Sequence, residues 1–269
     1  MPQSTDSPQF FFRSCAAKIT LAIAVLGCLV GGAGCSHNNP PGKAQLSDEF
    51  YQNLLVAFAA RDYNRVKDGL LKINDAGIAD KRTLYLGALL ALIEQNQEKA
   101  VLDLKDALVL DPDYGEAHNT LGTVYLQQKQ FAAAETEFLE AAGNPHYQTP
   151  EKAYHNLGNL YQLQNQQDQA ASCYLKALEL QPNYFPSHYE LSQLYAASGK
   201  LELAAQESEK ARQLSPEHPG VWLQIGKIEA ARNNPDAAAA AFKEVMKLQP
   251  EGFFADQATV ELKRLPESR

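Results

Sequence analysis

The stretch that decides the fold is 151-EKAYHNLGNLYQLQNQQDQAASCYLKALELQP-182, in which two helical patterns follow each other. The first pattern places Leu157, Gly158 and Tyr161 on one helix face, because they fall at i, i+1 and i+4. The second pattern has a small-large-small series at i, i+4 and i+7, made by Ala170, Tyr174 and Ala177. Gly158 has no side chain, so we expect the second helix to approach the first closely there. Pro182 ends the second helix, since proline lacks the N–H that a helix interior needs.

The same pattern returns along the chain, usually after 34 residues. Three prolines are spaced by this interval, Pro182, Pro216 and Pro250, and Pro112 lies ahead of them. The matching alanines are Ala100, Ala134, Ala170, Ala204 and Ala238. This period is the signature of tetratricopeptide repeats, in which each helix pair buries its apolar face by stacking on the next. The sequence therefore predicts an all-α solenoid of about six helix pairs with a C-terminal capping helix, and a surface suited to binding proteins.

The composition of the amino terminus and the repeat period together divide the chain into four regions. We expect a signal peptide at 1–34, a flexible tether at 35–46, the superhelix at 47–250, and a capping helix with a tail at 251–269. The six pairs are expected at about 47–78, 81–112, 115–148, 151–182, 185–216 and 219–250. The first pair has few signature residues, as is usual for a terminal repeat. The capping helix should cover the last pair with side chains at i, i+4, i+8 and i+11, namely Phe254, Ala258, Leu262 and Leu265.

The amino terminus reads as an export signal. Arg13 and Lys18 precede an uncharged apolar run at 19–30, which is short for a membrane span. The motif 32-GAGC-35 that follows resembles a bacterial lipoprotein signal, which implies lipidation at Cys35. One alternative is Cys28 in 25-VLGC-28, although that site would leave Leu29 and Val30 near the mature N-terminus. The other alternative is a plain secretory signal.

Composition argues against several function classes. The chain has a formal charge of −8, and its lysines and arginines form no stripe that would favour nucleic acid or anionic lipid. Cys173 alone remains after the N-terminal region, so no disulfide framework is predicted. The six histidines lack metal-ligand spacing, and no glycine-rich phosphate loop is present. We therefore predict no catalytic residue, metal, cofactor or small-molecule substrate.

One connection is longer than the others. Ala134 and Ala170 are 36 residues apart, and the excess lies in 143-GNPHYQTPEKAYHNLG-158. This segment resembles the enlarged loop of the PilF/PilW/Tgl group of type IV pilus outer-membrane lipoproteins. The motif residues here are Pro145, Tyr147, Pro150 and Glu151. A simpler interpretation is a connection with two prolines that only reorients the stack.

The resemblance implies a function. It implies a lipid-anchored scaffold on the periplasmic side of the outer membrane. The implied partner is a secretin subunit, which the scaffold would help to localise and multimerise. The alternative is a general periplasmic adaptor that scaffolds envelope or peptidoglycan enzymes.

The repeat register also predicts where a partner binds. In such repeats, first-helix side chains line the concave wall, and in the first two pairs these positions are apolar: Tyr51, Leu55, Phe58, Tyr85, Leu89 and Leu92. We expect them to form a groove for an amphipathic segment. Alternatively, a register shift in the first pair turns them inward. The wall of the fourth pair is mostly polar, with Lys152, His155, Asn159, Gln162 and Leu163. His118, His155 and His188 lie at nearly equivalent repeat positions, which favours an architectural role.

Overall fold

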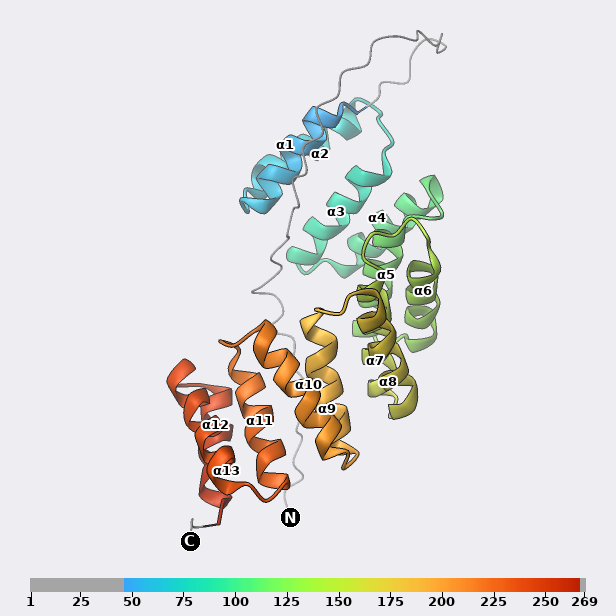
Figure 1. Cartoon of the computed structure of the whole chain (residues 1–269). Coiled ribbons are helices and arrows are strands. Elements are labelled where there is room, and N and C mark those ends of the chain that lie inside the picture. The colour runs from blue at the N-terminus through green and yellow to red at the C-terminus, as the bar shows by residue number, and fades with distance from the viewer. Residues whose placement is uncertain (1–45, 267–269) are drawn as a thin grey trace, which may run out of the picture. The chain divides into compact units, whose positions relative to one another are not determined.

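The computed structural model describes residues 46–266, which form thirteen α-helices (Figure 1). The predicted signal peptide, Cys35 and nearly all of the predicted tether lie outside the described residues. The chain divides into two compact units, one ending at Ala79 and one beginning at Asp80. Each unit is considered by itself below.

The first unit contains one helix pair, α1 (Asp48–Ala59) and α2 (Tyr63–Asp75). The second unit contains five pairs and a final helix. Its helices are α3 (Lys81–Ile93), α4 (Gln97–Leu110), α5 (Gly115–Gln127), α6 (Phe131–Gly143), α7 (Pro150–Leu163), α8 (Gln167–Leu180), α9 (Phe185–Ala197), α10 (Leu201–Leu214), α11 (Pro219–Ala231), α12 (Pro235–Leu248) and α13 (Phe253–Arg264). The predicted all-α repeat solenoid is confirmed.

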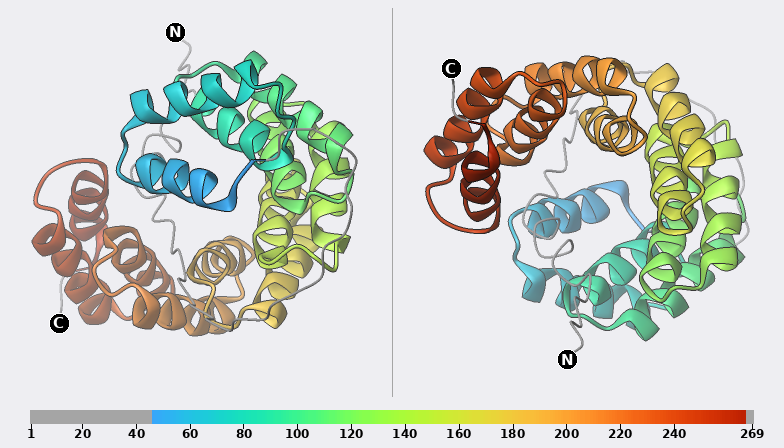
Figure 2. Two further views of the ribbon diagram at one scale, coloured as in Figure 1. Left: turned by 90° about the horizontal axis from the view of Figure 1, so that it is seen from above. Right: turned by 90° about the horizontal axis from the view of Figure 1, so that it is seen from below.

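Within the second unit, the helix pairs follow one another around a curve (Figure 2). Each first helix packs on the second helix of its own pair, and each second helix packs on the next first helix. In addition, first helices of successive pairs contact each other, α5 with α7 and α9 with α11. Because first helices approach one another this closely, they line the short, inner side of the curve.

The close approach predicted at Gly158 is confirmed. A methyl group on Gly158 would lie 2.4 Å from the Tyr174 ring, a distance that no packed structure tolerates. The same glycine-aromatic contact joins Gly122 to Phe138 and Gly226 to Phe242. These three aromatic side chains are fully buried. Glycine in the first helix and a large ring in the second therefore hold three of the five pairs of this unit together.

The first pair uses the opposite arrangement. Here the large residue, Leu54, lies on the first helix, and the glycine, Gly69, lies on the second. A methyl group on Gly69 would come within 2.2 Å of Leu54 Cδ2. The pair therefore packs closely although it lacks the usual signature residues.

The two helices of every pair are joined by a turn with one residue in the left-handed region. Its φ lies between 59° and 71° in all six pairs, at Arg61, Gln95, Lys129, Asn165, Gly199 and Asn233. Glycine and asparagine adopt this conformation readily, whereas other L-residues are strained in it. The turn geometry is thus constant although its residue varies.

The final helix covers the last pair as expected. Ala258 of α13 is fully buried in a cluster with Leu223 and Phe242, and the three other predicted residues pack against that cluster. Because α13 contacts both α11 and α12, it closes the C-terminal end of the apolar core.

Candidate protein-binding site on the inner wall

Aromatic side chains line the inner side of the second unit, and we call the surface made by its first helices and the turns before them the inner wall. Three ring pairs recur along it. Tyr85 and Tyr114 have ring centroids 5.4 Å apart, and both His155–Tyr184 and Tyr189–His218 are separated by 5.5 Å. In each pair, a first-helix residue contacts the turn residue that precedes the next first helix. Such contacts stabilise the turns and give the wall an aromatic surface.

A chain of polar side chains crosses the wall at α7, α8 and α9. His155 Nδ1 lies 3.1 Å from Ser187 Oγ, and His155 Nε2 lies 3.2 Å from Asn159 Nδ2. The Tyr174 hydroxyl lies 2.7 Å from Asn159 Oδ1 and 2.6 Å from Gln162 Oε1. The Gln162 amide in turn donates to the carboxylate of Glu190.

The number of protons fixes the direction of these hydrogen bonds. A tyrosine hydroxyl has one proton, so Tyr174 can donate to only one of the two amide oxygens. Turning the Asn159 amide by 180° resolves this, because oxygen and nitrogen positions are assigned from the network. Asn159 Nδ2 then donates to Tyr174, and Asn159 Oδ1 accepts from His155 Nε2–H. Every donor now has one acceptor, and His155 is neutral. Burial lowers the pKa of His155 to about 4, in agreement with this assignment.

The chain ends at Glu190, a half-buried acid on α9. Burial raises the pKa of this carboxyl group to about 7, and the hydrogen bond from Gln162 offsets only part of that effect. A second amide, Gln193 Nε2, lies 3.4 Å from Glu190 Oε2. Both donors are uncharged.

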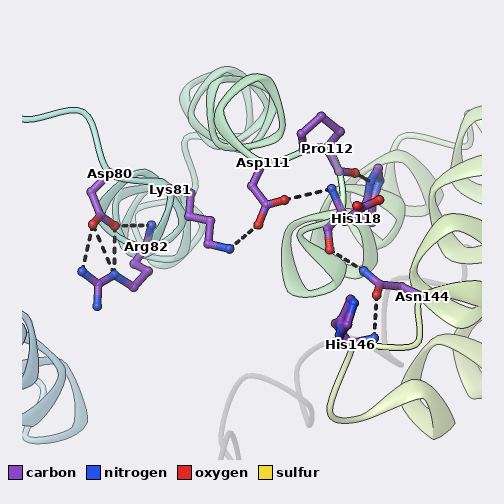
Figure 3. Close-up of polar contacts among 9 residues, drawn as sticks. Asp80, Lys81, Arg82, Asp111, Pro112, His118, Asn144 and His146 are labelled. Carbon is purple, nitrogen blue, oxygen red and sulfur yellow. Dashed lines mark hydrogen bonds and ion pairs between the residues drawn. The ribbon is translucent and has the colours of Figure 1, made fainter. Parts of the chain in front are cut away.

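Two histidines hold the turns between pairs. His118 Nδ1 lies 2.6 Å from Glu137 Oε2. His118 Nε2 lies 2.8 Å from the Pro112 carbonyl (Figure 3). His188 makes the equivalent contacts to Glu207 and the Pro182 carbonyl, at 2.5 and 2.8 Å. In the last pair, Trp222 Nε1 donates to the Pro216 carbonyl at 2.7 Å. These residues are architectural.

His155 does not share that position. It lies one residue further along its helix than His118 and His188, and it takes part in the wall network instead. The architectural role therefore fits His118 and His188, whereas His155 lies on the wall, where the repeat register also placed it. A shift of one residue rotates a side chain by about 100° around a helix, which separates a turn contact from the wall.

The long connection folds back onto the turn before α5. The Asn144 amide donates to the Asp113 carbonyl, and the His146 N–H donates to Asn144 Oδ1 at 2.8 Å (Figure 3). Tyr147 is buried against Gly115, where a methyl group would lie 2.6 Å from the Tyr147 Cβ. Of the other predicted loop residues, Pro145 is exposed, Pro150 begins α7, and Glu151 is half-buried. The insertion thus supplies a buried anchor that the repeats lack.

Tyr147 also meets a predicted groove residue. Burial raises the pKa of Tyr147, and the neighbouring Tyr85, Glu116 and Glu151 add to that effect. The Tyr85 hydroxyl forms a hydrogen bond of 3.3 Å with Thr120 Oγ1, in which either oxygen can be the donor. Tyr147 of the insertion therefore lies near Tyr85, although the sequence placed the two in separate features. The 36-residue interval indicates the insertion, but it does not say where the loop packs.

The remaining groove residues lie on α1 and α3. In the first unit, Tyr51 is buried, and Leu55 and Phe58 are half-buried. In the second unit, Leu89 is half-buried, and Leu92, like Tyr85, packs partly against the core between α3, α4 and α5. Each set therefore keeps some apolar surface on a first helix.

Lys81, Arg82, Asp80 and Asp111 surround the start of α3 (Figure 3). Lys81 pairs with Asp111 across the repeat, and Arg82 pairs with Asp80 at 2.9 Å. Their charges are therefore matched locally. Among residues 46–266, no cluster of His, Cys, Asp and Glu could hold a metal ion. None of the helices in that range has the length and apolarity that a bilayer span needs.

The repeats, their stacking and the inner wall define the chain as a tetratricopeptide-repeat protein of the solenoid class. Tetratricopeptide-repeat profiles match residues 85–147, 151–184 and 173–206. A comparison with curated protein sequences finds no match.

Solved structures extend the likeness to nearly the whole described chain. PilW, a widely conserved type IV pilus biogenesis factor, is 21% identical with a TM-score of 0.70, and the match covers 81% of this chain and 96% of PilW. PilF of Pseudomonas aeruginosa is 20% identical with a TM-score of 0.72, over 80% of this chain and 96% of PilF. YrrB, a repeat protein with an unusual peptide-binding site, is 21% identical with a TM-score of 0.53, over 67% of this chain and 92% of YrrB. At these identities the likeness shows the fold.

Proposed function

We propose that this protein is a lipid-anchored scaffold that binds an outer-membrane secretin subunit and assists its localisation and multimerisation in type IV pilus biogenesis. The observation that carries the proposal is the near full-length match to PilW and PilF, which covers 81% and 80% of this chain. PilW and PilF also match over nearly their own whole length, 96% of each chain. The lipoprotein-like 32-GAGC-35 supports the anchored location.

The inner wall supports a binding role. Its aromatic pairs and polar side chains offer the mixed surface by which repeat solenoids hold extended or helical segments of other proteins. The half-buried leucines Leu55 and Leu89 add apolar surface on α1 and α3. Because binding needs no reacting group, this role also agrees with the neutral hydrogen-bond network around His155.

Deletion of the gene tests the function. We expect secretin protein to remain at normal levels while its heat-resistant multimers, measured by gel electrophoresis and immunoblotting, are strongly depleted. Complementation with Leu55→Glu and with Leu89→Glu, each confirmed as folded by circular dichroism, tests the two apolar surfaces separately. Normal multimers in the deletion strain, together with a cell-wall or division defect, would favour the periplasmic adaptor instead.

A further inference from the structure

The carboxylate of Glu190 retains unused hydrogen-bonding capacity. An ionised carboxylate accepts up to about four hydrogen bonds. Here it accepts from the Gln162 amide and, at 3.4 Å, from the Gln193 amide. Since the second contact is long and both donors are neutral, nothing in this network balances the negative charge.

The titratable groups around Glu190 carry no positive charge at neutral pH. Tyr174 on α8 and Tyr189 on α9 lie close enough that the charge of Glu190 adds to the rise that burial causes in the pKa of each hydroxyl. His155, at the far end of the hydrogen-bond chain, is neutral because burial lowers its pKa to about 4. The site is therefore a partly desolvated acid near two tyrosines, of which Tyr174 is fully buried and Tyr189 is half-buried.

A charge in such a site is normally paired. Desolvation disfavours an ionised carboxyl group, and an adjacent cation reverses that effect. A Lys or Arg side chain would form charge-assisted hydrogen bonds with the carboxylate and could reach the half-buried ring of Tyr189. Both interactions are stronger in a partly desolvated site than in water.

We propose that Glu190, next to the half-buried Tyr189 on α9, forms a subsite on the inner wall for a Lys or Arg side chain of an extended partner segment. The proposal rests on the proposed role of the inner wall in binding a protein segment, and it does not depend on that partner being a secretin. It assigns a basic residue to the part of the partner that reaches α9.

Selection from a library of random twelve-residue peptides tests the subsite, with the purified full chain immobilised at pH 8. We expect the enriched peptides to share a Lys or Arg. For one enriched peptide, fluorescence anisotropy should give a dissociation constant roughly tenfold or more higher for Glu190→Gln, since a hydrogen bond to a charged group is lost. Replacing the shared basic residue of the peptide with Gln should weaken binding equally.

Glu217→Gln is the matched control, because Glu217 is an exposed acid in a turn and its loss changes the net charge by the same amount. We expect this variant to bind within about twofold of the parent, since exposed charges interact weakly with a distant ligand. Enrichment of peptides without basic residues, no enrichment at all, or equal binding by Glu190→Gln would each overturn the subsite. If one of these results is obtained but the parent gene still restores secretin multimers in the deletion strain, the subsite is overturned and the proposed function stands.

Discussion

Glu190 has a consequence for stability as well as for binding. Its folded pKa of about 7 exceeds the ordinary value of 4.5, so the folded chain holds this proton more tightly than the unfolded chain does. The contribution of this group to stability is therefore greatest below pH 4.5 and is lost as pH rises through about 7. Glu190→Gln removes this loss. We expect the variant to be more stable than the parent by about 1–3 kcal/mol at pH 8 and nearly equal at pH 4.

Thermal unfolding followed by circular dichroism at both pH values measures this difference. Glu217→Gln should show little change at either pH, because exposed charges contribute little to stability. Equal stability of Glu190→Gln and the parent at pH 8 would mean that the carboxyl group is well solvated, and would weaken the argument for a desolvated site.

His118 also has a raised pKa, but here we expect replacement of the native side chain to destabilise the fold. Desolvation opposes its charged form, but the Glu137 carboxylate and the Pro112 carbonyl outweigh desolvation and raise its pKa. A raised pKa means that its stabilising effect is complete below about pH 6.5 and is lost as pH rises through the folded value. His118→Gln should therefore cost about 2 kcal/mol at pH 5.5 and less at pH 9. His146→Gln, at an exposed position, should show no such pH dependence in the same unfolding experiment.

At the scale of helices and turns, the residue with positive φ between the helices of each pair affects the stability of the chain. Lys129 has φ of 59°, which costs an L-residue about 1–2 kcal/mol relative to glycine, partly offset by the greater freedom of glycine in the unfolded chain. We expect Lys129→Gly to stabilise the chain by about 0.5–1 kcal/mol in denaturant titrations. Lys129→Ala keeps the strain and should give no gain. Gly199→Ala should destabilise by about 1 kcal/mol, and a stabilising effect there would contradict the strain argument.

One contact between paired helices could be predicted from the sequence, and another could not. The Gly158–Tyr174 contact followed from the sequence, because a glycine at a helix face and an aromatic residue on the next helix recur with the repeat. The Leu54–Gly69 contact could not be predicted in the same way. It exchanges the helices that carry the large and small residues, and a repeat pattern detects only residues that stay at equivalent positions.

For the whole molecule, the attachment to a membrane is the property that most needs a test. We expect Cys35→Ala to release the protein from the outer-membrane fraction, because the lipid would then be missing. Membrane fractionation with immunoblotting measures this. Cys28→Ala is the control and should remain bound. The reverse result would show that Cys28 is the modified residue.

The sequence by itself determined the repeat architecture. Helix periodicity, the closing prolines and the 34-residue interval are local properties, so they appear in one dimension and predict the fold, the capping helix and the position of the insertion. The resemblance to pilus lipoproteins likewise depended on motifs and their spacing. These features are repeated or contiguous, and short-range physics is enough to recognise them.

Only the tertiary structure decided how the inner wall is built. The contact of Tyr147 with Gly115 and the hydrogen-bond chain from His155 to Glu190 join residues about 30 positions apart on different elements. Which hydroxyl or amide meets which acceptor depends on the distance and rotation between stacked helices, and a one-residue difference separates His155 from His118 and His188. The burial of Glu190 arises from the same packing, because an acid in a polar stretch of sequence becomes desolvated only when neighbouring helices close around it.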